Sequence, residues 1–178
     1  MNDNASGAGG TKRNGKGMTR ILVLADTHIP RSAHDLPHEI YDVLDDIDMI
    51  FHAGDFVEKE IYEKLAKLKP LKAVYGNMDS RQVTENLNQK EIVQVGRFRI
   101  GLIHGYGVPR DIIDTVRGEF RDVHAIVFGH SHEAINMTKE GILFFNPGSP
   151  TDKVFAAYNS YGILEVTDTK IEGKIVKL

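Results

Sequence analysis

The segment "AIVFGHSH", residues 125–132, joins a short apolar run to a glycine and two histidines. A run of this length, bounded by glycine, is typical of a strand that is buried on both faces. The two histidines are two positions apart, and residues at that spacing on an extended chain point to the same side. The segment therefore predicts a buried strand whose carboxyl end carries two imidazoles into one crevice.

The same arrangement recurs along the chain, with a different polar side chain each time. The polar residues that follow apolar runs are Asp26 and His28 after "ILVLA", Asp55 after "MIFHAG", Asn77 after "KAVYG", His104 after "IGLI", and His130 and His132 after "AIVFG". Ligand crevices in open α/β sheets form at the carboxyl ends of strands, where the loops diverge. These seven side chains are therefore expected to gather at one edge of the fold.

Helical patterns separate the first apolar runs. We expect strands at 20–26, 48–55 and 71–77, with amphipathic helices at 37–47 and 58–68 between them. Helix 37–47 is expected to begin at a proline, a common first residue of helices. The βαβαβ order predicts parallel strands joined by right-handed crossovers.

The pattern changes in the second half of the chain. Residues 90–105 predict an antiparallel hairpin around a Gly-Arg turn, and 109–120 predict a helix that begins at a proline. Further strands are expected at 125–129 and 142–146, followed by a hairpin over 161–178. These elements predict a layered α/β domain with parallel strands early and antiparallel strands late.

The composition is that of one globular domain, which we expect to span residues 18–178. The chain has 178 residues, of which 41% are hydrophobic and 26% charged. Residues 1–17 are polar and rich in glycine and asparagine, and are expected to be a flexible N-terminal extension or leader. The sequence has no apolar run near the roughly 20 residues that span a bilayer, so no membrane association is expected. It also lacks cysteine and the apolar core of a signal peptide, which favours a cytoplasmic location.

The charge balance bears on the class of partner. The formal net charge is −3, and residues 1–17 are basic, so the expected domain is more acidic than the whole chain. Proteins that bind long nucleic acids do so largely by neutralising phosphates with basic side chains. We therefore expect no long nucleic acid as a partner.

Each of the seven polar residues has an ordinary structural explanation when taken alone. A single histidine is more often a surface or core residue than a ligand, an aspartate after a strand can cap a helix, and Asn77 can be a turn residue. Their repeated position at strand ends favours a shared metal site. Nitrogen and oxygen donors without sulfur suit Mn²⁺, Fe, Ni²⁺ or Zn²⁺. The remaining histidines, which we expect to be structural or on the surface, are His34, His38, His52 and His124.

In order along the chain, five motifs resemble those of the calcineurin-like metallophosphoesterase superfamily. They are "DTH" (26–28), "GD" (54–55), "GNMD" (76–79), "HG" (104–105) and "GHSH" (129–132). The short chain, with "NPGS" (146–149) and "SYGILEV" (160–166), also resembles the compact bacterial and archaeal phosphodiesterase branch, to which the retromer small subunit is related. The resemblance implies an α/β/β/α sandwich of mixed sheets flanked by helices.

The resemblance also implies a division of labour among the seven residues. It assigns one divalent ion to Asp26, His28 and His132, a second ion to Asn77, His104 and His130, and the bridging position to Asp55. The implied reaction is hydrolysis of a small phosphodiester by a metal-bridging hydroxide, with Mn²⁺ the most expected ion. The residues implied to serve catalysis directly are Asp55, Asn77 and His104.

Two positions depart from the pattern of that family. Met78 stands where many members have a histidine that assists the leaving group, and Tyr106 stands where relatives often have a histidine. The tyrosine is expected either to contact substrate or to be a surface aromatic residue. Specificity is expected to lie in the loops 29–36, 78–90 and 105–110.

Other functions compatible with the resemblance are a phosphomonoesterase and a protein-interaction scaffold like the retromer small subunit. A scaffold is disfavoured because all seven ligand positions are filled by metal-capable side chains. A nuclease is disfavoured by the acidic balance and by the lack of basic and aromatic platforms. Assembly as a homo-oligomer is possible.

Overall fold

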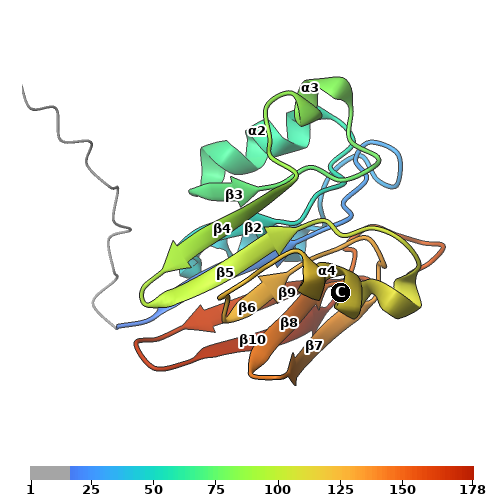
Figure 1. The fold of residues 1–178 in the computed structure, drawn as a ribbon. Helices are drawn as coiled ribbons and strands as arrows, with labels where there is room; N and C mark the ends of the chain where they lie inside the picture. The colour runs from blue at the N-terminus through green and yellow to red at the C-terminus, as the bar shows by residue number, and fades with distance from the viewer. Residues whose placement is uncertain (1–16) are drawn as a thin grey trace, which may run out of the picture.

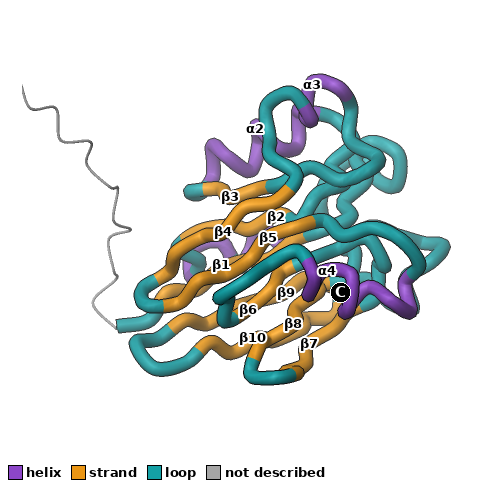
Figure 2. Tube along the Cα trace, viewed as in Figure 1, coloured by secondary structure: helices purple, strands orange, loops and turns teal. Residues whose placement is uncertain are grey.

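A computed structural model describes residues 17–178, so the expected extension over 1–17 lies outside the described residues except for Gly17. The described part is a sandwich of two five-stranded sheets (Figures 1 and 2). The first sheet has the order β10-β9-β1-β2-β3 and the second has the order β4-β5-β6-β8-β7.

The strands of the first sheet are β1 (Thr19–Leu24), β2 (Met49–His52), β3 (Leu71–Ala73), β9 (Ser160–Val166) and β10 (Ile171–Lys177). Those of the second sheet are β4 (Lys90–Val95), β5 (Phe98–Ile103), β6 (Ala125–Val127), β7 (Ala134–Lys139) and β8 (Ile142–Pro147). The α-helices are α1 (His38–Asp42), α2 (Lys59–Leu68), α3 (Arg81–Thr84) and α4 (Ile112–Gly118). No helix in residues 17–178 is long and apolar enough to cross a membrane.

Each sheet contains a trio of adjacent parallel strands. In the first sheet β2 pairs with β1 and β3 in parallel, as the βαβαβ pattern predicts. In the second sheet β6 pairs in parallel with β5 and β8. The expectation that the late strands are antiparallel is therefore wrong for β5, β6 and β8, which pair in parallel with one another. It is right for the hairpins β4–β5 and β9–β10. The helix between β5 and β6 was predicted from the sequence, but it was not recognised as a crossover between parallel strands.

Successive side chains on a strand point to opposite faces of its sheet. Because both faces of each sheet are covered, these side chains alternate between the core between the two sheets and the core beneath the helices. On β1, Ile21 and Val23 face the second sheet, whereas Leu22 and Leu24 face the helices. Helix α2 buries Ile61 and Leu65 on the outer face of the first sheet, and α4 covers the outer face of the second (Figure 1). The expected α/β/β/α sandwich is confirmed.

The helices differ from their expected bounds because two of them begin or end in tighter turns. The helix expected over 37–47 is α1 followed by a 3₁₀ turn at Leu44–Asp46, and the one expected over 109–120 is a 3₁₀ turn at Pro109–Asp111 followed by α4. The sequence analysis also missed β7 and α3. β7 is an edge strand with mostly exposed, partly polar residues, and α3 is a single turn, so neither has a clear periodic pattern.

The ring of Phe145, on β8, packs between two glycines of the first sheet. A Cβ built at Gly162 would lie 2.4 Å from the Cε1 atom of Phe145, and one at Gly173 would lie 2.5 Å from its Cε2 atom. These glycines, on β9 and β10, leave the space that this large side chain fills, so the two sheets approach closely there.

Gly162→Ala is therefore expected to lower the free energy of unfolding by about 1–3 kcal/mol, because the ring of Phe145 must leave its position. Gly118→Ala is the matched control, since a Cβ at Gly118 meets nothing within 4 Å. Urea denaturation measures both. Equal stability of the two variants would show that the ring can shift at no cost.

Candidate metal centre

The seven expected ligands all lie just beyond the carboxyl ends of the parallel strands. Asp26 and His28 follow β1, Asp55 follows β2, Asn77 follows β3, His104 follows β5, and His130 and His132 follow β6. Contacts of 3.1–3.5 Å between their side chains bring them together from the loops of both sheets, and Figure 2 shows the loops that follow the strands. The structure thus places every one of the predicted residues in a single cluster.

Backbone hydrogen bonds connect the loops that carry the ligands. The amide N–H of Asp26 donates to the carbonyl oxygen of Gly54 at 3.0 Å, and that of His28 donates to the carbonyl oxygen of Asp55 at 3.0 Å. The carboxylate of Asp26 accepts the amide N–H of His130 at 3.0 Å. This last bond joins the ends of the two sheets.

Much of the backbone at the cluster is in the left-handed region. Residues with positive φ include Asp26 (53°), His28 (43°), Asp55 (60°), His130 (69°) and His132 (57°). Non-glycine residues adopt this conformation rarely, and such strain gathers where function requires it. The neighbouring Gly76 is required for another reason, since a Cβ there would lie 2.2 Å from the Oδ1 atom of Asp55.

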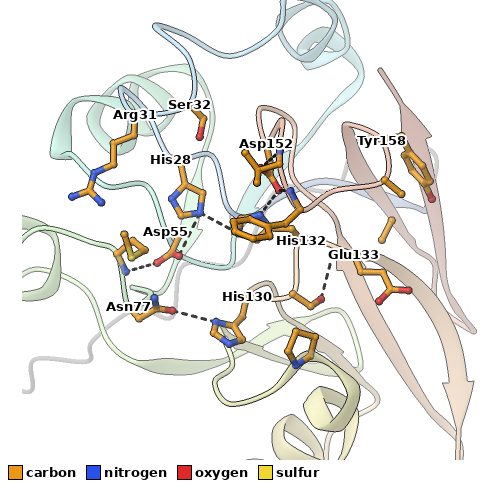
Figure 3. Close-up of a pocket in the computed structure, with 17 residues that line it drawn as sticks. His28, Arg31, Ser32, Asp55, Asn77, His130, His132, Glu133, Asp152 and Tyr158 are labelled. Atoms are coloured by element: carbon orange, nitrogen blue, oxygen red, sulfur yellow. Dashed lines mark hydrogen bonds and ion pairs between the residues drawn. The ribbon is translucent and has the colours of Figure 1, made fainter.

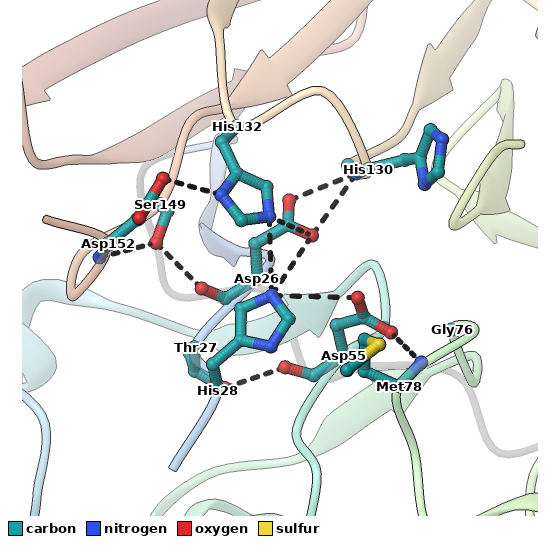
Figure 4. Close-up of polar contacts among 12 residues, drawn as sticks. Asp26, Thr27, His28, Asp55, Gly76, Met78, His130, His132, Ser149 and Asp152 are labelled. Atoms are coloured by element: carbon teal, nitrogen blue, oxygen red, sulfur yellow. Dashed lines mark hydrogen bonds and ion pairs between the residues drawn. The ribbon is translucent and has the colours of Figure 1, made fainter. Parts of the chain in front are cut away.

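Asp26, His28 and His132 form the first group of donor atoms (Figure 4). The Nε2 atoms of His28 and His132 are 3.2 Å apart. The Oδ1 atom of Asp26 lies 3.9 Å from Nε2 of His28 and 3.5 Å from Nε2 of His132. All three side chains are at least largely buried.

Asp55 lies between this group and a second one. Its Oδ2 atom is 3.5 Å from Nε2 of His28 and 3.4 Å from Nε2 of His104. Beyond it, the Oδ1 atom of Asn77 lies 3.1 Å from Nε2 of His104 and 3.2 Å from Nδ1 of His130. One carboxylate oxygen therefore faces donors of both groups.

The second nitrogen of three of the histidines is already bound. Nδ1 of His104 lies 2.8 Å from the carbonyl oxygen of Ala53, and Nε2 of His130 lies 2.9 Å from that of Gly107. Nδ1 of His132 lies 2.6 Å from Oδ2 of Asp152. Since a carbonyl or carboxylate only accepts hydrogen bonds, these nitrogens carry the protons in the neutral rings. The opposite nitrogens then present lone pairs to the cluster.

When the rings are neutral, lone pairs consequently converge on the centre of the cluster. In the neutral rings, Nε2 of His104 and Nδ1 of His130 both face the amide oxygen of Asn77, which has only lone pairs to offer. A cation between these atoms turns the repulsion into coordination. The donor set therefore fits divalent ions, with imidazole and oxygen ligands suited to Mn²⁺, Fe, Ni²⁺ or Zn²⁺.

The electrostatics of the free side chains agree with that fit. Burial raises the pKa of Asp26 to about 6 despite its neighbouring histidines. Burial opposes protonation of His104, but its hydrogen bond to Asp55 and the charge of Asp26 outweigh it and raise the pKa to about 9. The pair of carboxylates thus attracts positive charge into this buried place, as either a proton or a metal ion.

Asp152 is a candidate site residue that the sequence analysis missed. It orients the ring of His132, and its carboxylate also accepts the amide N–H groups of Val154, Phe155 and Ala156 at 2.8, 3.0 and 2.8 Å. Burial alone would raise its pKa, but the bonds from His132 and from the backbone lower it to about 2. A carboxylate behind a metal-binding histidine fixes the ring and increases its basicity. The only sequence signal was its position just after "NPGS".

Asp79 and His52 are also part of the site's support. The carboxylate of Asp79, the last residue of "GNMD", accepts the amide N–H groups of Asp55, Val57 and Gly76. His52 is fully buried, and its ring lies 3.1 Å from Oγ1 of Thr27 and accepts the amide N–H of Gly54. His52 therefore has a structural role, as expected: it connects the loop that carries Asp26 to the loop that carries Asp55.

The remaining histidines lie apart from the cluster. His38 is largely exposed beside Glu39, and His124 accepts the amide N–H of Arg99. His34 is also exposed. The hydroxyl of Tyr106 donates to Glu119 at 2.7 Å, and this tyrosine is a surface aromatic residue outside the pocket lining.

A pocket of about 880 Å³ opens over the ligands (Figure 3). All three expected specificity loops contribute to it, through Arg31 and Ser32, through Met78, and through Pro109. A fourth wall was not expected from the sequence. It is the loop 152–158, whose lining residues are Asp152, Val154, Phe155, Ala157 and Tyr158.

Comparison with known proteins gives the family. A calcineurin-like phosphoesterase superfamily domain matches residues 19–169. A "probable metallophosphoesterase" from Methanothermobacter thermautotrophicus is 32% identical over 159 residues, which cover 88% of this chain and 91% of that protein.

Solved structures agree. The zinc complex of Vps29 from Entamoeba histolytica has a TM-score of 0.70 at 26% identity, covering 89% of this chain and 99% of that one. A structure described as a novel archaeal phosphodiesterase has a TM-score of 0.70 at 20% identity, covering 90% and 100%, and so shares the fold. The chain belongs to the calcineurin-like phosphoesterase superfamily.

Proposed function

We propose that this protein is a phosphodiesterase that uses two divalent metal ions to hydrolyse small phosphodiesters. The observation that carries the proposal is the convergence of seven side chains whose imidazole nitrogens, carboxylate oxygens and amide oxygen lie 3.1–3.9 Å from one another. The family is one of phosphoesterases, and the fold is shared with an archaeal phosphodiesterase.

The geometry supports a division of the ligands into two sets. Asp26, His28 and His132 would hold one ion. Asn77, His104 and His130 would hold the other. Asp55 would contribute to both, because its Oδ2 atom faces both sets. When bound, two such ions supply a hydroxide nucleophile from water at neutral pH and neutralise charge on the phosphoryl oxygens.

The chain's own contribution is to fix the ligands and to shape the pocket. The amide N–H of Met78 donates to Oδ1 of Asp55 at 2.8 Å, which leaves Oδ2 for the cluster. Asp152, Ala53 and Gly107 fix the rings of His132, His104 and His130. Coordination atoms held in this way need little rearrangement, so binding energy is not spent on ordering them.

A diester fits the pocket better than a monoester. A phosphodiester carries one negative charge near neutral pH, whereas a monoester carries nearly two. Arg31 is the only Lys or Arg side chain among the described residues that line the pocket, and it has no hydrogen bond or ion pair to hold it over the ligands. The side chain of Met78 cannot donate a proton, so position 78 supplies no general acid to assist a poor leaving group.

Purified protein is expected to hydrolyse bis(p-nitrophenyl) phosphate only after loading with Mn²⁺ or a similar ion, and to lose that activity in EDTA. Hydrolysis of p-nitrophenyl phosphate should be slower at equal concentration. Release of p-nitrophenolate measures both. A protein with a full complement of metal and no turnover of either ester would contradict the proposal and would favour a scaffold role.

Asp152→Asn is expected to weaken Mn²⁺ binding by about 10- to 100-fold, because the ring of His132 loses its carboxylate partner. Isothermal titration calorimetry measures the affinity, and circular dichroism checks the fold. Asp114→Asn is the matched control, since that exposed carboxylate pairs only with Lys139 at 2.9 Å on the surface. Equal affinities in the two variants would show that Asp152 does not support the metal ligands.

A further inference from the structure

The loop 152–158 exposes large apolar side chains beside the candidate metal centre. Val154 is 77% exposed and Phe155 is 78% exposed, more than any other large hydrophobic residue of the described chain. Single exposed apolar residues are common, but adjacent ones that line a pocket mark a binding surface. Here Val154, Phe155 and Tyr158 all line the pocket over the ligands.

Hydrogen bonds hold this loop in place, so the exposure of its side chains is not the result of a loose backbone. Three successive amide N–H groups, those of Val154, Phe155 and Ala156, donate to the carboxylate of Asp152. From the other end of the loop, the side-chain amide of Asn159 donates to the carbonyl oxygens of Ser149 and Asp152 at 3.2 and 2.6 Å. A pre-ordered apolar surface binds a ligand without the cost of ordering the loop.

The same carboxylate connects the loop to the metal ligands. Asp152 holds both the ring of His132 and the backbone of Phe155. The rings of Phe155 and His132 are 5.9 Å apart between centroids, at an interplanar angle of 79°. In Figure 3, Tyr158 stands on the side of the pocket away from Asp55 and Asn77. A phosphoryl group at the ligands therefore has an aromatic wall beside it.

We propose that loop 152–158 binds a planar, uncharged aromatic group on one ester arm of the substrate, with Phe155 as the stacking residue. The inference rests on the proposed function, and it narrows the substrate class to phosphodiesters of aromatic or nucleobase-bearing alcohols. Stacking on an exposed ring accepts any planar π-face, so neither hydrogen-bonding groups nor charges are needed in the loop.

The positive charges at and beside the loop argue against a cationic arm such as a quaternary ammonium group, although the acidic side chain of Glu133, outside the loop, also lines the pocket. The Nζ atom of Lys177 lies 3.9 Å from the ring centroid of Tyr158, so a cation already occupies that aromatic face. Lys153 adds a second exposed positive charge within the loop. A small polar alcohol would gain little from Val154 and Phe155. A neutral aromatic group is the occupant that uses both the apolar area and the ring.

Three esters with the same p-nitrophenolate leaving group test the proposal on the Mn²⁺-loaded full chain. Their second arms are methyl, phenyl and thymidine 5′-yl. For wild type, kcat/KM is expected to be higher for the phenyl and thymidine esters than for the methyl ester. In Phe155→Ala that preference should fall roughly tenfold. The preference is measured as the ratio of kcat/KM for the aromatic ester to kcat/KM for the methyl ester. A general loss of metal or of folded protein cancels in this ratio, because all three esters are assayed with the same preparation of protein.

Two further variants sharpen the result. Phe155→Tyr should keep the preference because it keeps the ring. Leu68→Ala, which removes a 41% exposed residue on α2, should leave the ratio unchanged. If wild type prefers the thymidine ester but not the phenyl ester, the second arm of the substrate is a nucleoside. If it prefers both, the loop accepts any aryl group. A wild-type ratio near one, or a ratio that Phe155→Ala does not change, would overturn the inference while leaving the proposed function intact.

Binding measurements separate this inference from the proposed function. If wild type turned over none of the esters, the proposed function would fail. Calorimetric titration of the Mn²⁺-loaded chain with thymidine 5′-monophosphate and with inorganic phosphate would then decide the inference. Phe155→Ala should weaken binding of the nucleotide roughly tenfold relative to phosphate. Equal affinities of wild type for the two ligands would contradict the aromatic site.

Discussion

The buried carboxylate of Asp26 is the constraint on which the rest of the site depends. It is fully buried where the ends of the two sheets meet, and it accepts the amide N–H of His130. Its backbone is bound on both sides, by the carbonyl oxygen of Gly54 and by the hydroxyl of Ser149. A buried carboxylate is costly unless it is neutralised by a proton or by neighbouring positive charge, which here can come from protonated histidine or from a metal ion. The burial that raises the pKa of Asp26 to about 6 therefore favours a cation beside it.

Residues around the candidate ligands hold the loops that carry them in place through hydrogen bonds. Asp79 accepts three backbone amide groups from the loops of Asp55 and Gly76, and His52 connects Thr27 to Gly54. These contacts offset the strain of the left-handed residues at the strand ends. Asp152 extends the same support outward, since it fixes both a histidine of the cluster and the apolar wall of the pocket. One side chain therefore connects the candidate ligand His132 to the wall of the pocket.

The sequence predicted the cluster well because its signal is repeated. Each ligand follows an apolar run, and parallel strands place such residues at a common edge, so Asp26 and His132 could be brought together although they lie far apart in the chain. The supporting residues could not be found in this way. Asp152 lies in an irregular loop, and its partner is identified only by the fold. Likewise β7, an exposed edge strand, lacks the continuous apolar run that reveals β1 or β8.

The central claim is that Asp55 joins two metal positions, and metal content tests it most directly. Protein dialysed against Mn²⁺ and measured by inductively coupled plasma mass spectrometry is expected to hold two ions per chain. His28→Asn should lose close to one ion, because His28 belongs to a single set of ligands, whereas Asp55→Asn should lose most of both. Equal metal content in the two variants, or a single ion in wild type, would contradict the account.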